Sequence, residues 1–372
     1  MNILIACDKF RESLEGKEVS EALKEGILSV QKEAQIRITQ IADGGEGSLQ
    51  VLSDIYHCTP QEIHLTNAVG SSIRSSFGFN PTSKTAILEM ASYVGLAELN
   101  HDERNPAVAS SYGLGQAIDA AVKIGAKHII IGVGGSASND GGAGMLRALG
   151  FQFLDENQNI IHPAGGNLHS ICHIKIPEQP LPTGMQLTIA TDVSNPICGP
   201  SGATYTYARQ KGAPESELEQ LEHNMLHFAT LIHGISGNDV LQKQGYGAAG
   251  GVPLSACELL GALITSGSEL IFQGLGLAKS IQESEVVITG EGKIDHQTLN
   301  GKAISPIVTS TLEEDKKLFL VCGLYEGSSS ELDIHSRYEL SSLAKELGLD
   351  SFQDASQLCF EAGKRIGKSL KH

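Results

Sequence analysis

Short apolar runs alternate with longer amphipathic stretches along most of this chain. Mostly aliphatic runs of this kind are typical of strands buried on both faces, and they occur at Ile3–Cys7, His128–Ile131, Leu187–Ala190, Glu285–Ile288 and Leu318–Cys322. Apolar residues at helical spacing predict helices near 19–30, 49–55, 104–125, 214–233, 303–312, 339–347 and 353–369. This alternation predicts an α/β fold, in which helices cover a parallel sheet.

The stretch 61–91 has a different pattern. Glu62–Leu65, Ile73–Phe79 and Thr85–Met90 are separated by polar turns, which predicts short antiparallel strands. A chain of 372 residues is also long for one domain. We therefore predict a doubly wound parallel-sheet (Rossmann-like) α/β domain built from both chain ends, and a mixed α/β domain inserted into it. The predicted bounds are 1–65 with 280–372 for the first and 66–279 for the second, with the active site in the cleft between them.

Composition and charge narrow the class of protein. Hydrophobic residues make up 41% of the chain and charged residues 19%, as in ordinary globular proteins. The net charge of −16, which no Lys/Arg block offsets, argues against nucleic acid or an anionic membrane as a partner. Seven cysteines without a Cys-x-x-Cys pair indicate reduced thiols. With no signal peptide at the start and no apolar run of the ~20 residues that a membrane helix needs, we expect a cytoplasmic protein.

Three segments combine glycines with carboxylates, at 42–47, 134–142 and 289–295. Glycines let the backbone turn sharply or approach a ligand closely, and exposed backbone N–H groups suit anionic oxygens. Clustered Asp and Glu suit a hard divalent cation. Phosphate and Mg²⁺ together indicate phosphoryl transfer. Any one of these segments is equally consistent with a tight turn, but three in one chain favour the functional interpretation.

Matches to the common nucleotide-binding motifs are weaker evidence than these three segments. The closest approach to a P-loop, Gly363–Ser369, is one residue short and predicts only a solvated helix end. Gly132–Ala137 fits the dinucleotide fingerprint, with Asp155 downstream at about the expected distance. An NAD(P)-dependent oxidoreductase that uses this loop is therefore the main alternative.

A zinc site is a further alternative. His162, His169, Cys172 and His173 lie close together in the sequence, but their spacing matches no common zinc pattern. We expect surface or packing roles for them.

Other polar groups follow predicted strands directly. Asp8 and Lys9 come after the first strand, and Asp192 and Asn195 after the strand that ends at Ala190. Ligands of open α/β folds bind at the carboxyl ends of strands, so these residues are site candidates. A salt bridge within a loop is the alternative for Asp8–Lys9. For Asp43 and Glu46 the alternative is capping of a helix start.

Together these motifs resemble the bacterial glycerate kinase family that is unrelated to P-loop kinases. The resemblance runs from residue 1 to about 325 and rests on ordered segments at 8–14, 42–47, 132–142, 191–196, 247–251, 288–295, 297–298 and 301–302. It implies a cytoplasmic enzyme of two α/β domains that transfers the γ-phosphoryl group of ATP to D-glycerate with Mg²⁺, and it favours 2-phosphoglycerate over 3-phosphoglycerate. Arg11 and Ser138 stand where the family usually has lysine and threonine, and both keep the relevant chemistry.

The resemblance does not assign the individual roles, so these follow from the chemistry of phosphoryl transfer. Asp192 is the favoured base for the acceptor hydroxyl, with Asp8 as the second choice, and Lys9 would neutralise charge on the transferring group. We assign Mg²⁺ binding to acidic residues among Asp43, Glu46, Asp140 and Asp295. At least one of the four is expected to cap a helix or to support the site without binding the metal. The residues expected to bind glycerate or ATP are Arg11, Gly44, Gly45, Gly134, Gly135, Ser136, Ser138, Asn139, Asn195, Gly290, Glu291, Gln297, Thr298 and Lys302. A non-catalytic sugar-acid binding protein is a third possibility.

Overall fold

The computed structural model describes residues 1–10, 13–42, 47–294, 304–326 and 335–371. The chain divides into two compact units. Residues 1–43 and 267–372 form the first unit, and residues 44–266 form the second. Both are α/β, which confirms the predicted fold class. The predicted domain boundaries stay a prediction; in the structure, β3 (Thr59–Thr66) pairs along its length with β4 (Ser72–Asn80) of the second unit.

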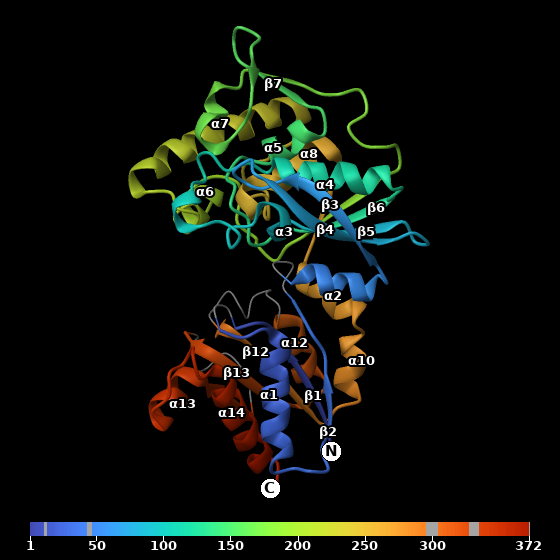
Figure 1. The fold of residues 1–372 in the computed structure, drawn as a ribbon, viewed down its shortest axis with the longest axis vertical. Helices are drawn as coiled ribbons and strands as arrows, with labels where there is room; N and C mark the ends of the chain where they lie inside the picture. Colours follow the sequence, from blue (N-terminus) through green and yellow to red (C-terminus); the bar gives the residue numbers. More distant parts are fainter. Residues whose placement is uncertain (11–12, 43–46, 295–303, 327–334, 372) are drawn as a thin grey trace. The chain divides into compact units, whose positions relative to one another are not determined.

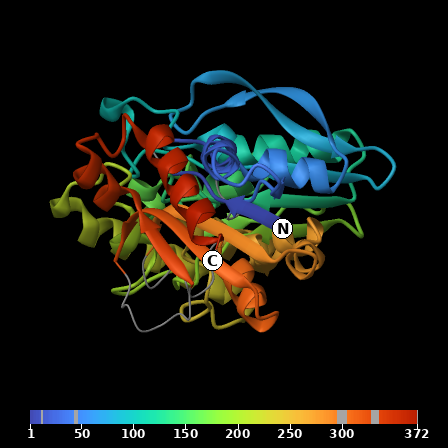
Figure 2. The ribbon, with the colours of Figure 1, turned by 90° about the horizontal axis from the view of Figure 1, so that it is seen from below.

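The first unit is built on a five-stranded sheet with the order β14-β13-β12-β1-β2. Every neighbouring pair is parallel. Figure 2 shows β1 (blue) and α14 (red), from opposite ends of the chain, in this same unit. Its strands are β1 (Asn2–Cys7), β2 (Gln35–Ile38), β12 (Val286–Ile294), β13 (Lys317–Tyr325) and β14 (Ser336–Glu339). Its helices are α1 (Gly16–Leu28), α9 (Gly267–Gly274), α10 (Leu277–Gln282), α12 (Ser305–Glu313), α13 (Leu340–Leu347) and α14 (Ala355–Ser369).

Both faces of this sheet are buried, because helices cover each of them. Alternate β1 residues such as Ile3 and Ile5 pack in one core cluster with residues of α1 and α14, which lie side by side in Figure 1. Leu4 and Ala6 face the other cluster, with residues of α10 and α12. The strands predicted at 3–7, 285–288 and 318–322 are confirmed, and they lie in one sheet as expected.

The P-loop-like stretch 363–369 lies within α14. The stretch is a helix end, as predicted, and Lys368 and Ser369 are exposed there, but its two glycines are not solvated. Gly363 and Gly367 are buried, and a Cβ on Gly363 would meet the backbone carbonyl of Leu23 in α1. Gly26 of α1 approaches the Phe360 carbonyl of α14 in the same way. The glycines therefore let two helices pack closely.

The second unit holds a six-stranded mixed sheet with the order β11-β10-β6-β5-β4-β3 and a small sheet with the order β8-β7-β9. The β3–β4 and β4–β5 pairs are antiparallel, as predicted for 61–91, whereas β5, β6, β10 and β11 pair in parallel. Its further strands are β5 (Thr85–Glu89), β6 (His128–Gly132), β7 (Gln152–Leu154), β8 (Ile160–Ile161), β9 (His173–Lys175), β10 (Gln186–Ala190) and β11 (Leu263–Thr265). Its helices are α2 (Ser48–Ile55), α3 (Ala91–Val94), α4 (Tyr112–Lys123), α5 (Ala143–Ala148), α6 (Ala203–Tyr207), α7 (Leu218–Ser236) and α8 (Val252–Leu260), with 3₁₀ turns at His101–Glu103, Gly165–Ser170, Glu215–Glu217 and Ala248–Gly251.

The helix predicted from residue 104 begins only at Tyr112. Pro106 disfavours helical backbone at the residue before it, and Ser111 is held in a turn by the carboxylate of Asp140, which accepts from its N–H and its hydroxyl. Val108, which lies before this start, is 59% exposed. Leu114 and Ile118 do face the core, with Ile129 and Ile131 of β6.

No helix among the described residues is both long and apolar enough to cross a membrane. All seven cysteines are free thiols.

Candidate functional site

The parallel strands of the second unit bring several predicted site residues to one edge of the sheet. In the register of the sheet, Gly132 at the end of β6 pairs with Glu89 of β5 and with Ala190 of β10. Ala190 also pairs with Thr265 of β11. The segments that follow these strands therefore begin at the same edge. They are the loop 134–142, the segment that starts with Asp192, and Ser266.

Asp192 is half-buried directly beyond β10. Its Oδ1 accepts a hydrogen bond of 2.7 Å from the hydroxyl of Ser266, which follows β11. Two neighbouring strand ends thus hold this carboxylate in place. A carboxylate positioned in this way is a suitable proton acceptor for a hydroxyl.

The loop 134–142 connects β6 to α5 and is fixed at several points. Gly135, Gly141 and Gly142 have φ values of 72°, 64° and 80°, in the left-handed region that favours glycine. Backbone hydrogen bonds tie Gly135 and Ala137 to the 94–96 segment, and the Gly141 N–H donates to the carbonyl of Gly250. The outer part of the loop is accessible, because Gly135 is exposed, while residues 136–142 are buried.

Gly250 lies in the small-residue segment 245–251, which is a packed turn. Its own φ is 65°, and a Cβ there would meet the carbonyl of Ser138. The turn 245–251 therefore packs against the loop 134–142 and supports it. This close backbone approach explains the choice of glycine.

Asp140 lies in this loop with both carboxylate oxygens engaged by the protein. They accept hydrogen bonds from the N–H and hydroxyl of Ser111 and from the N–H groups of Gly142 and Gly144, at 2.8–3.1 Å. Complete burial raises the pKa of Asp140, and these hydrogen bonds oppose that rise. The carboxylate joins the start of α4 to the start of α5. Its predicted role as a metal ligand stays a prediction.

Lys211 contacts the same loop and was missed by sequence reasoning. It is 3% exposed, and its Nζ donates to Ser136 Oγ at 2.9 Å and to the Ser138 carbonyl at 2.7 Å. Burial lowers the pKa of Lys211 to about 7, and the negative charge of Asp140 opposes that shift. A lysine is rarely this buried, so its position beneath the loop is unusual.

The segment after Asn195 packs against the loop as well. Asn139 donates from Nδ2 to Thr204 Oγ1 at 3.2 Å, while Asn139 Oδ1 and Ser138 Oγ are buried without a hydrogen-bond partner among the described residues. Asn195 donates to the Ser201 carbonyl at 2.7 Å and accepts from Tyr207 at 2.8 Å. Buried polar atoms without partners are uncommon, which makes Ser138 and Asn139 candidates for ligand contact.

Glu89 is a second residue that sequence reasoning did not identify. It is 6% exposed at the end of β5. Its two oxygens accept hydrogen bonds from the N–H of Leu49 in the first turn of α2, at 3.1 Å, and from the hydroxyl of Ser92, at 2.6 Å. The only signal in the sequence was its place at the carboxyl end of a short strand.

The first unit gathers its candidates where β1 ends beside the middle of β12. The N–H of Asp8 donates to the carbonyl of Gly290, and Asp8 Oδ1 accepts from the N–H of Lys9 at 2.8 Å. Gly290 pairs with Val321, and a Cβ at Gly290 would meet the Val321 carbonyl. Glu291, the next residue of β12, is half-buried. Asp8, Lys9, Gly290 and Glu291 therefore lie at one edge of this sheet.

The remaining candidates lie outside the described residues. They are Arg11, Asp43, Gly44, Gly45, Glu46, Asp295, Gln297, Thr298 and Lys302.

The dinucleotide interpretation is not supported by the geometry. In that fingerprint the helix begins within the glycine motif, whereas α5 begins at Ala143, well beyond Ala137. Asp155 lies in the turn between β7 and β8, where it accepts hydrogen bonds from the N–H groups of Asn157 and Asn159. It therefore caps a hairpin of the small sheet.

The residues considered for zinc lie in and around that small sheet. His162, His169, Cys172 and His173 are exposed. Within the described ranges, no three His, Cys, Asp or Glu side chains come together in a group that could hold a metal ion.

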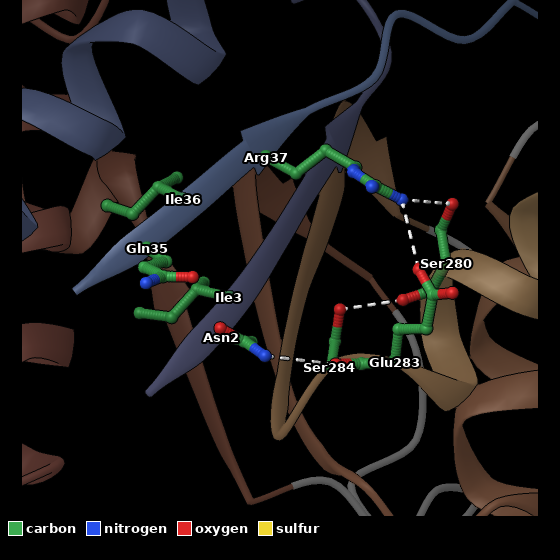
Figure 3. A pocket seen from close by; sticks show the side chains of 8 residues that line it. All are labelled: Asn2, Ile3, Gln35, Ile36, Arg37, Ser280, Glu283 and Ser284. Carbon is green, nitrogen blue, oxygen red and sulfur yellow. Dashed lines mark hydrogen bonds and ion pairs between the residues drawn. The ribbon is translucent and has the colours of Figure 1, made fainter.

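A cavity of about 220 Å³ lies in the first unit (Figure 3). It is lined by the start of β1, by β2, and by Ser280, Glu283 and Ser284, and Arg37 contacts Ser280 and Glu283 at 3.1 and 3.5 Å. The cavity is at the amino-terminal ends of the strands, whereas Asp8 and Lys9 follow the carboxyl end of β1. No predicted site residue lines it.

Comparison with known proteins identifies the class. A model of the glycerate kinase family matches residues 3–371. A protein of Bacillus subtilis (strain 168) named glycerate kinase is 36% identical over 376 residues, which cover 100% of this chain and 98% of the relative. A protein of Escherichia coli (strain K12) named glycerate 2-kinase is 34% identical over 373 residues, with coverage of 100% and 98%.

The fold agrees with this result. A protein of Salmonella typhimurium LT2, whose crystal structure was solved under the name glycerate kinase 2, superimposes with a TM-score of 0.79 at 31% identity, covering 100% of this chain and 98% of that one. The chain belongs to the glycerate kinase family, and it is a kinase.

Proposed function

We propose that this protein transfers the γ-phosphoryl group of ATP to D-glycerate and that the product is 2-phosphoglycerate. The observation that carries the proposal is the full-length likeness to proteins named glycerate kinase. One of them is named glycerate 2-kinase, which favours the 2-position. The free cysteines agree with a reducing cytoplasm, where ATP is available.

Residues of the second unit are proposed to bind and activate glycerate. Asp192 accepts the proton of the attacking hydroxyl, because it is a half-buried carboxylate held at a strand end. The accessible backbone at Gly134 and Gly135, together with Ser136, Ser138 and Asn139, binds an anionic group. Asn195 already makes hydrogen bonds to Ser201 and Tyr207, so its contribution is to shape this segment.

Residues of the first unit are proposed to act on ATP. Lys9 is a compact cation beside the carboxyl end of β1 and suits a point contact with a phosphate oxygen. Asp8 is the alternative proton acceptor, and Gly290 and Glu291 belong to the adjoining strand β12. Arg11, Gln297, Thr298 and Lys302 of this unit complete the proposed binding set, together with Gly44 and Gly45 of the second unit.

Mg²⁺ is proposed as the metal. It would neutralise charge on the phosphates, and it typically takes only one or two protein carboxylates. Asp140 fits this role poorly, because both of its oxygens accept hydrogen bonds from the protein. We therefore assign the ligands to Asp43, Glu46 and Asp295, and we assign Asp140 to support of the loop.

A coupled assay of ADP release tests the reaction. With ATP, MgCl₂ and D-glycerate we expect ADP to form in proportion to enzyme, and a control without glycerate should give background only. Oxidation of glycerate with NAD(P)⁺ is measured in parallel, because it would support the oxidoreductase alternative.

The absence of glycerate-dependent ADP would refute the proposed function. If calorimetry then still detected glycerate binding, the protein would be a sugar-acid binding protein without turnover.

A further inference from the structure

Lys211 contacts the loop 134–142, which other hydrogen bonds already hold in place. Backbone hydrogen bonds hold Gly135 and Ala137 to the 94–96 segment, and Gly250 holds Gly141. Ser255 donates from its hydroxyl to the Gly141 carbonyl at 2.5 Å. A buried lysine is a costly further support, because removing an amine from water is unfavourable. Packing alone would be served equally well by methionine. The role of Lys211 is therefore one that needs an N–H donor.

The contact between Lys211 and Ser136 determines what the serine hydroxyl can do. In its protonated form Lys211 only donates, so in that form Ser136 Oγ accepts from Lys211 Nζ, at 2.9 Å. The hydroxyl hydrogen of Ser136 is then available to donate, and it has no acceptor within the part of the chain that the structure describes. The second bond of Lys211, to the Ser138 carbonyl at 2.7 Å, fixes the direction of the amine.

The position of Ser136 suits contact with a ligand. It is 5% exposed and follows the accessible Gly134–Gly135 turn, at the strand-end edge where Asp192 also lies. A hydroxyl that accepts from a cationic donor is polarised and becomes a stronger donor itself. Such a donor is best matched by an anionic oxygen, because charge-assisted hydrogen bonds are the strong ones.

We infer that Lys211 is a positioning residue that fixes the Ser136 hydroxyl as a hydrogen-bond donor to an anionic oxygen of a substrate. The oxygen belongs to the carboxylate of glycerate or to a phosphate of ATP. The inference rests on the proposed function and deepens it, since it adds a residue that spacing and motif did not indicate.

A double-mutant cycle tests this inference in the full-length protein. The variants are Ser136→Ala, Lys211→Met and the double variant, and KM is measured for glycerate and for ATP separately. Because a hydrogen bond to a charged group is involved, Ser136→Ala should raise the KM of one substrate by about tenfold or more. Lys211→Met should raise the KM of the same substrate. The KM of the double variant should be at most about twofold higher than that of the more impaired single variant.

Ser255→Ala is the matched control. It removes another buried hydroxyl that contacts the loop but leaves Ser136 and Lys211 in place. In a variant that carries both substitutions, the fold-changes in KM from Ser255→Ala and from Lys211→Met should multiply, since the two residues act independently. The substrate whose KM rises identifies the oxygen as carboxylate or phosphate.

The inference is overturned if Ser136→Ala leaves both KM values within about twofold of wild type, or if the Ser136 and Lys211 effects multiply. Melting temperatures are recorded for all variants. If Lys211→Met does not fold, Lys211→Leu, which also removes the N–H donor, replaces it in the cycle. A wild-type protein without glycerate-dependent ADP release would instead refute the proposed function, so the two failures are distinguishable.

Discussion

Replacement of Asp192 by alanine is expected to lower kcat by about 10²–10⁴-fold, the range of general acid–base catalysis. The proposed base removes the proton as the hydroxyl attacks, so the loss should appear in kcat, with little change in the KM of ATP. Asp192→Asn should lose nearly as much, because the amide keeps the size of the side chain and a carbonyl that can accept from Ser266 but cannot take a proton. Initial rates at saturating ATP and glycerate give both values.

Asp119→Ala is the control for this experiment. Asp119 is a partly exposed carboxylate of the same unit, on α4, paired with Lys123. Surface pairs contribute little, so this variant should keep wild-type kcat. A near-normal kcat in Asp192→Ala would contradict the assignment, and Asp8 would become the residue to test.

Replacement of Asp140 by asparagine is expected to destabilise the protein by about 3 kcal/mol, within the range for breaking a buried charged network. The amide puts a donor where the N–H groups of Ser111, Gly142 and Gly144 require acceptors. The melting temperature should fall by about 6–12 °C for a unit of this size. Thermal unfolding followed by circular dichroism measures it.

Asp155→Asn is the matched control for that change. Asp155 also accepts two backbone N–H bonds, from Asn157 and Asn159, but it is partly exposed in a turn. Its replacement should lower the melting temperature much less than Asp140→Asn does, because water can satisfy the groups left without a partner. If Asp140→Asn kept the wild-type melting temperature and lost only activity, the role as a metal ligand would be favoured after all.

The sequence could predict the parts of this fold that local patterns determine. Runs such as Ile3–Cys7 are buried on both faces, so hydrophobicity alone marks them as strands. The start of α4 depends instead on Asp140, a residue distant in sequence whose carboxylate holds Ser111. The glycines of α14 resemble a phosphate loop in sequence, but they serve contact with α1. Such effects come from tertiary neighbours that no local window contains.

The residues of the candidate site also divide into those that the sequence indicates and those that only the folded structure reveals. The glycine-acid segments can be recognised from their composition, and Asp192 from its place after a strand. Lys211 is 75 residues from Ser136 in the sequence and stands in a polar stretch, Arg209–Gly212, that is typical of a surface turn. Only the folded chain shows that it is buried beneath the loop.

The most direct test of the central claim is NMR of the product formed from ATP, MgCl₂ and ¹³C-labelled D-glycerate. We predict a single new ³¹P phosphomonoester signal, with carbon–phosphorus coupling that identifies the ester oxygen as that on C2. Attachment at C3 would contradict the proposed product while leaving the kinase assignment in place. If no phosphoester of glycerate forms, the central claim is wrong.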